Sequence, residues 1–164
     1  MNKLLMLFSL LLISCSSSEI DDGVYSKSTT VELNTKSLSK APWSEVQNDG
    51  SDLALLNSKT KSYFLFNSAC RKYESSNLNS LTASILSGIS DLVYIEKANT
   101  THQDREAMLI IAEGNIDGVS RFFQVLTTQK NNCIYDYALI ANSKKNLELD
   151  AISFKKFINL IKLK

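Results

Sequence analysis

The apolar residues of this chain fall into short runs separated by polar, turn-forming clusters, and from about residue 41 these runs take strand and helix periods. We expect strands at 52–57, 62–68, 92–97, 105–115, 119–128 and 133–141, with a polar loop over 98–104. Asp117-Gly118 between two apolar runs is a strong hairpin signal, and the polar residues 58–61 predict a second hairpin.

Helical spacing occurs in two segments. Leu78, Leu81 and Ile85 follow Asn77, a good N-cap residue, and precede Gly88, which can end a helix. A second helix is expected from about Leu147, because one stripe carries its apolar residues: Leu147, Ala151, Phe154, Ile158 and Ile161.

The last three expected strands are apolar on both faces. In 105–115, for example, one face carries Leu109 and Ile111, and the other carries Met108 and Ile110. A sheet that is apolar on both faces must be covered on both. The sequence therefore predicts an α+β domain in which helices cover both faces of an antiparallel sheet, an αβα sandwich.

The order of elements from Trp43 to Leu163 resembles the Mog1/PsbP-like sandwich: two opening strands, a helix, a long hairpin, a last strand and a closing helix. The resemblance implies this fold and action through partner surfaces, and it supplies no catalytic residue. The segments 67–70 (Asn-Ser-Ala-Cys) and 132–136 (Asn-Cys-Ile-Tyr-Asp) are also similar to strand ends of small uncharacterised bacterial lipoproteins.

The N terminus has the features of an export signal. Lys3 precedes an apolar run over 4–13, which is shorter than the roughly 20 apolar residues that cross a bilayer as a helix. The quartet Leu12-Ile13-Ser14-Cys15 resembles the lipobox of bacterial lipoproteins. That resemblance implies that 1–14 is a signal peptide, that signal peptidase II cuts before Cys15, and that the Cys15 thiol carries a diacylglycerol group.

An ordinary cleaved signal is the alternative, but serines fill 16–18 and no Ala-x-Ala site offers another cut. Residues 15–40 are rich in Ser, Thr, Asp, Lys and Asn without a sustained period, so we expect a lipidated, flexible tether. Val31 and Leu33 are the one indication of a short strand within it. A flexible segment of about 25 residues has a root-mean-square end-to-end distance of roughly 28 Å. A single domain is expected over 41–164.

Three cysteines occur, and lipidation would consume Cys15. An exported chain with two cysteines left favours a disulfide between Cys70 and Cys133. Cys70 follows the end of one expected strand and Cys133 opens the last one, positions that antiparallel neighbours would bring together. Two separate buried thiols are the alternative.

No catalytic or metal-binding constellation emerges. A nucleophile pair of Cys70 and His102, with Asp104 orienting the ring, would lose its thiol to the disulfide. One histidine and two distant cysteines lack the ligand spacings of structural zinc, so neither metal nor cofactor is expected. A net charge of +1 with no basic surplus gives no indication of nucleic-acid binding.

Several polar and aromatic residues keep a binding role open. Arg105 and Arg121, on adjacent expected strands, are either surface charges or face an anionic ligand. Asp136 lies in an otherwise apolar strand, where a carboxylate either hydrogen-bonds or serves a pocket. The strand aromatics are interpreted as core rather than as the wall of a ligand groove: Tyr63, Phe64, Phe66, Phe122, Phe123, Tyr135 and Tyr137.

The leading hypothesis is a non-enzymatic, lipid-anchored protein of the bacterial cell envelope that binds or assists another envelope component. Its anchor at Cys15 makes the membrane its first partner. Ser16 differs from the aspartate that resembles an inner-membrane retention signal, which favours the periplasmic side of the outer membrane. One alternative is a carrier that holds an apolar or anionic small molecule in an enclosed pocket of at least about 300 Å³ between sheet and helix. Another is an enzyme using Cys70 or His102.

Overall fold

The computed structural model describes residues 31–32, 35–47, 50–70 and 77–163. The expected signal peptide (1–14), Cys15 and the start of the expected tether lie outside this part of the chain. The strands are β1 (Val31–Glu32), β2 (Trp43–Glu45), β3 (Leu53–Asn57), β4 (Tyr63–Cys70), β5 (Ser90–His102), β6 (Arg105–Ile116), β7 (Val119–Lys130), β8 (Cys133–Ala141) and β9 (Lys162–Leu163). The helices are α1 (Thr35–Leu38), α2 (Leu78–Ile85) and α3 (Lys144–Leu160).

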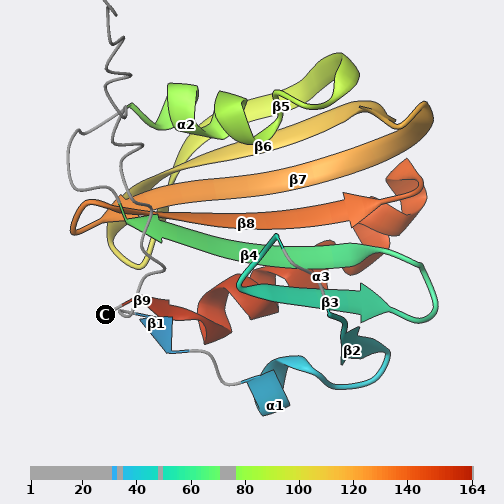
Figure 1. Cartoon of the computed structure of the whole chain (residues 1–164), viewed down its shortest axis with the longest axis horizontal. Coiled ribbons are helices and arrows are strands. Elements are labelled where there is room, and N and C mark those ends of the chain that lie inside the picture. Colours follow the sequence, from blue (N-terminus) through green and yellow to red (C-terminus); the bar gives the residue numbers. More distant parts are fainter. Residues whose placement is uncertain (1–30, 33–34, 48–49, 71–76, 164) are drawn as a thin grey trace, which may run out of the picture.

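A 7-stranded antiparallel sheet dominates the molecule, in the order β2-β3-β4-β8-β7-β6-β5 (Figure 1). The expected hairpins β3–β4 and β6–β7 are confirmed, as are strand β8 and both main helices. Both α2 and α3 begin at a polar cap, since Asn77 accepts a hydrogen bond from the Ser80 amide and Ser143 accepts one from the Asn146 amide.

Two-residue turns join the long strands β5 to β8. Both residues of each turn have positive φ, as type I′ hairpin turns require: Gln103-Asp104, Asp117-Gly118 and Asn131-Asn132. The expected polar loop over 98–104 is therefore wrong except for its last two residues. β5 continues to His102, with Asn99 opposite Met108. Because β5 is an edge strand and mostly exposed, its second half, residues 96–102, forms a strand without the apolar run that marks buried strands.

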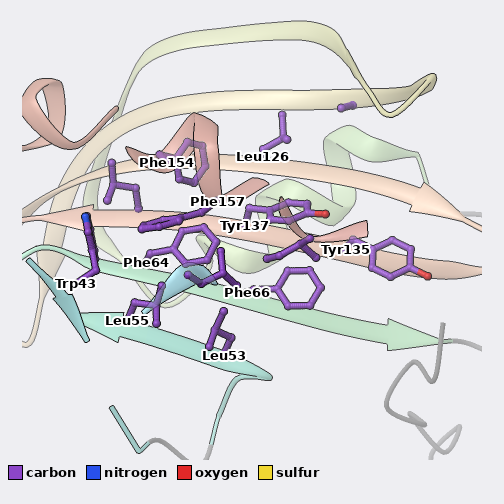
Figure 2. Close-up of a cluster of buried hydrophobic side chains, with 14 of the residues drawn as sticks. Trp43, Leu53, Leu55, Phe64, Phe66, Leu126, Tyr135, Tyr137, Phe154 and Phe157 are labelled. Atoms are coloured by element: carbon purple, nitrogen blue, oxygen red, sulfur yellow. The ribbon is translucent and has the colours of Figure 1, made fainter. Parts of the chain in front are cut away.

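The face of the sheet beneath α3 carries the main core. Aromatic rings from strands and helix interlock there, with centroids 5.1 Å apart for Trp43 and Phe157 and 4.9 Å for Phe64 and Phe157 (Figure 2). Phe66 and Tyr137 pack at 5.0 Å. These residues are buried, so most of the strand aromatics are core, as the sequence predicted.

The opposite face is covered only in part. α2 packs on β6 and β7, where it helps to bury Met108, Ile110, Phe123 and Val125. No described helix covers β3, β4 and β8 on this face, and Tyr63 is 42% exposed there. The expected αβα sandwich is therefore wrong: the fold is a large antiparallel sheet with few helices. An eight-residue helix is too short to cover a sheet of this width.

Some described residues of the segment expected to be tether pack against the body. β1 pairs with β9, placing Val31 opposite Leu163. Leu38 of α1 is buried in the α3-side core. Val31 and Leu38 thus contribute to the body. Among the described residues, no helix combines the length and apolar character that crossing a membrane takes.

Candidate binding surface

The disulfide is formed. Cys70, the last residue of β4, is bonded to Cys133, the first residue of β8, with an S–S distance of 2.06 Å. The two residues are register partners, so strand pairing itself brings the thiols together. This confirms the predicted bridge. Because the bond consumes the Cys70 thiol, the hypothetical pair with His102 lacks its nucleophile.

His102 is buried rather than solvated, at 5% exposure. Its ring packs edge-on against Tyr137, with centroids 5.3 Å apart, and its Nε2 lies 2.9 Å from Gln103 Nε2. Gln103 also donates to the Ile161 carbonyl at 2.7 Å and accepts from the Leu163 amide at 3.1 Å. Burial, and to a smaller extent the Lys162 charge, lowers the pKa of His102. Gln103, next to the buried His102, therefore holds the C-terminal segment through these two hydrogen bonds, which we call the Gln103 clamp.

The two arginines do not form a common site. Arg121 is paired opposite Gly114, whereas Arg105 opens β6 at the other end of the same hairpin. Arg121 donates a hydrogen bond to the neighbouring Ser120 carbonyl at 3.0 Å. The hypothesis that both face one anionic ligand is therefore wrong.

Three pockets on the described surface are open to solvent. One of about 420 Å³ lies between α2 and the sheet, and polar residues make up most of its lining: Asn77, Leu78, Asn79, Asn99, Arg105, Glu106, Met108 and Gln129. Beneath α3, aromatic rings pack against one another, with the ring centroids of Phe64 and Phe154 5.9 Å apart. Among the described residues, no group of three or more His, Cys, Asp or Glu side chains is placed to hold a metal ion.

A polar row runs across the sheet face opposite α3, from β4 through β8 to the fully buried Thr127 of β7. Asn67 of β4, Asp136 of β8 and Thr127 of β7 are register partners on adjacent strands. Neither Asp136 Oδ1 nor Thr127 Oγ1, both buried atoms, has a hydrogen-bond partner. Burial raises the pKa of Asp136 to about 7, an effect that the nearby Thr127 hydroxyl partly offsets. The row thus holds a carboxyl group that changes its charge near neutral pH.

Apolar side chains flank this row. We call the whole surface the open sheet face and define it by exposed and half-buried residues of β3, β4 and β8: Leu56, Tyr63, Leu65, Asn67, Asp136, Ala138 and Ile140. The sequence pattern marked Asp136 as unusual, but Leu56 and Leu65 were not predicted to lie on a surface. The signal was available, because Tyr63 and Leu65 alternate with the buried Phe64 and Phe66.

Comparisons with known proteins bear on the fold. No protein-family model and no curated protein matches this sequence. The solution structure of the PsbP protein of the cyanobacterium Synechocystis sp. PCC 6803 matches with a TM-score of 0.58 at 9% identity, covering 93% of this chain and 99% of that one. The fold is PsbP-like. A protein of unknown function from Pseudomonas aeruginosa matches with a TM-score of 0.55 at 7% identity, covering 87% and 88% of the two chains.

These matches support the resemblance to the Mog1/PsbP-like fold that the order of elements had indicated. At such low identity they bear on the fold alone. The candidate binding surface therefore rests on the residues of this chain itself, those of the open sheet face.

Proposed function

We propose that this chain is a non-enzymatic lipoprotein of the bacterial cell envelope, anchored through Cys15 after removal of residues 1–14. Its PsbP-like body faces the periplasm, with the outer membrane as the favoured site. There it binds another envelope protein through the open sheet face. The lipobox-like quartet supports the anchor. The observation that carries the binding role is the Asp136 carboxyl beside Asn67, at one end of a sheet surface that no described helix covers.

The composition of this surface supports a protein partner. Half-buried Leu65, Ala138 and Ile140 offer apolar contact area, and Tyr63 adds an exposed ring with a polar tip, a residue type enriched in protein interfaces. A donor from the partner would stabilise the ionised Asp136 carboxylate, and charge-assisted hydrogen bonds contribute about 1.5–3 kcal/mol. Binding would then favour the charged form and release a proton near neutral pH.

The anchor is tested by mass spectrometry of the protein purified from its native envelope. We expect the mature chain to start at Cys15 and to carry a thioether-linked diacylglycerol. Residues 1–14 still attached, or an unmodified thiol at Cys15, would contradict the lipoprotein proposal.

The binding surface is tested by placing a photo-crosslinking amino acid at Tyr63 in living cells. The matched control is the same amino acid at Tyr94 on β5, because the two tyrosines are similarly exposed, at 42% and 46%. We expect a discrete protein adduct from position 63 and none from position 94. Adding Asp136→Asn should reduce the adduct several-fold while the protein stays folded. An absent adduct, or equal adducts at both positions, would rule out the open sheet face as the interface.

A further inference from the structure

The outward side of α3 carries an apolar stripe that is exposed rather than packed in the core. Leu149, Ile152 and Leu160 are 58%, 70% and 42% exposed. The sheet side of the helix is instead occupied by the buried Leu147, Phe154 and Phe157. Since a helix repeats every 3.6 residues, the exposed stripe is continuous and includes two lysines: Lys145, Leu149, Ile152, Lys156 and Leu160. We call these five residues the α3 stripe.

The charges around the stripe have one dominant sign. Lys144 and Lys155 are also exposed on α3, against the single exposed acid Glu148. The helix's other carboxylate, Asp150, is buried and bonded to Asn57 and Thr60. Apolar residues interspersed with lysines suit the boundary between headgroups and acyl chains of an anionic membrane. Protein interfaces, by contrast, are depleted in lysine.

The path of the chain places this helix next to the anchored segment. β1 pairs with β9, which follows α3 directly, so Val31 lies opposite Leu163. Figure 1 shows β1 and β9 together at the end of α3. The chain that leads back to Cys15 therefore joins the body beside α3. This step rests on the lipid anchor of the proposed function.

We infer that the α3 stripe lies on the surface of an anionic lipid bilayer. Three exposed apolar residues and their lysines form a weak second contact, of the kind that complements a lipid chain on the same protein. The anchor makes this contact intramolecular, which raises the effective concentration of the bilayer at the helix. α3 then faces the membrane, and the sheet face on its far side is turned toward the periplasm.

The test uses the full chain, purified with its lipid and reconstituted in vesicles that contain a photoactivatable phospholipid. Vesicles of phosphatidylethanolamine with phosphatidylglycerol are compared with vesicles of phosphatidylcholine alone, and lipid adducts are mapped by mass spectrometry. The stripe variant is Lys145→Glu with Lys156→Glu. The control variant, Lys59→Glu with Lys97→Glu, changes the net charge equally at exposed lysines of the β3–β4 turn and β5.

We expect adducts within 144–160 on the anionic vesicles. Their yield should fall at least about fivefold on phosphatidylcholine and in the stripe variant, because each lysine near an anionic surface changes binding by about that factor. The control variant should leave the yield unchanged. Adducts confined to the segment before Val31, or equal losses in both variants, would overturn the inference. Crosslinking of the stripe to a protein in native envelopes would do the same.

Failure of the anchor is separable from failure of the helix contact. If Cys15 carries no lipid but 144–160 still forms adducts on anionic vesicles, the contact stands and the anchor falls. If Cys15 is lipidated and 144–160 forms none, the contact falls alone.

Discussion

The carboxylate of Asp150 accepts a hydrogen bond from the side-chain amide of Asn57, 2.8 Å away. Its other oxygen accepts one from the Thr60 hydroxyl at 2.6 Å. Asp150 lies in α3 and Asn57 ends β3, and both side chains are buried. These two hydrogen bonds connect α3 to the end of β3 and to the β3–β4 turn, and so hold the helix against the sheet.

Replacing Asp150 with Ala should lower the free energy of unfolding by about 2–3 kcal/mol, because the Asn57 amide would be left buried without its acceptor. Urea unfolding at pH 7 measures the loss. Glu148→Ala, at an exposed position of the same helix, should change it by less than about 0.5 kcal/mol. Equal losses in the two variants would show that the Asn57–Asp150 hydrogen bond does not account for the change in the free energy of unfolding.

Removing the bridge with Cys70→Ala and Cys133→Ala should destabilise the protein by about 4 kcal/mol in the chain-entropy view, because the bridge spans 63 residues. Urea unfolding with and without a reductant measures this. The reductant should destabilise the natural chain and leave the double variant unaffected. A reductant effect that persists in the double variant would place the sensitive bond elsewhere.

Stability should fall as the pH rises from about 4 to about 7. In this range the unfolded chain has ionised Asp136, whose ordinary value is 3.8, while burial keeps the folded-state pKa near 7. The folded state therefore binds more protons, and stability drops with rising pH. Asp136→Asn should remove this drop and be more stable than the natural chain at pH 8, by on the order of 1–3 kcal/mol.

The measurement is the urea midpoint as a function of pH. Glu113→Gln serves as the control, because Glu113 is exposed on β6. If the natural chain and Asp136→Asn give parallel pH profiles, the Asp136 carboxyl does not titrate as its burial implies.

The His102 ring should titrate below its ordinary value of 6.5, since burial disfavours the imidazolium and Lys162 adds repulsion. Stability linked to this group is then lost as the pH falls through 6.5, where the unfolded chain takes up the proton first. NMR of the ring protons reads the pKa directly. Lys162→Ala should raise it only part of the way, because burial is the larger cause. A normal titration in the natural chain would show that the ring is solvated.

Local patterns predicted the strands and turns well, because a strand's period of two and its turn residues are read over a few positions. Asp117-Gly118 predicted its hairpin, and Asn77 predicted the start of α2. The disulfide could also be predicted, since Cys70 and Cys133 mark the ends of neighbouring strands. The hairpin and the helix start depend on residue types near one point of the chain, and the disulfide depends on two cysteines 63 residues apart that lie at the ends of neighbouring strands.

Features set by the tertiary arrangement could not be predicted in the same way. The polar half of β5 becomes a strand only because β6 offers it an edge. Asp136 was identified as unusual, but its surroundings depend on which part of the sheet α2 leaves bare. The partners of Asp150 lie about 90 residues away in the chain, beyond any sequence pattern. The pattern of apolar residues along the strands therefore did not reveal how much of the sheet face opposite α3 is covered by a helix.

The pairing of Val31 with Leu163 has a practical consequence for labelling. Both ends of the described chain emerge at one corner, so a fluorophore or affinity tag fused to the C terminus would crowd the side from which the leading segment departs. The Asp117-Gly118 tip lies at the other end of β6 from the Gln103 clamp on this corner. An epitope inserted at that tip would report on the body while leaving its attachment undisturbed.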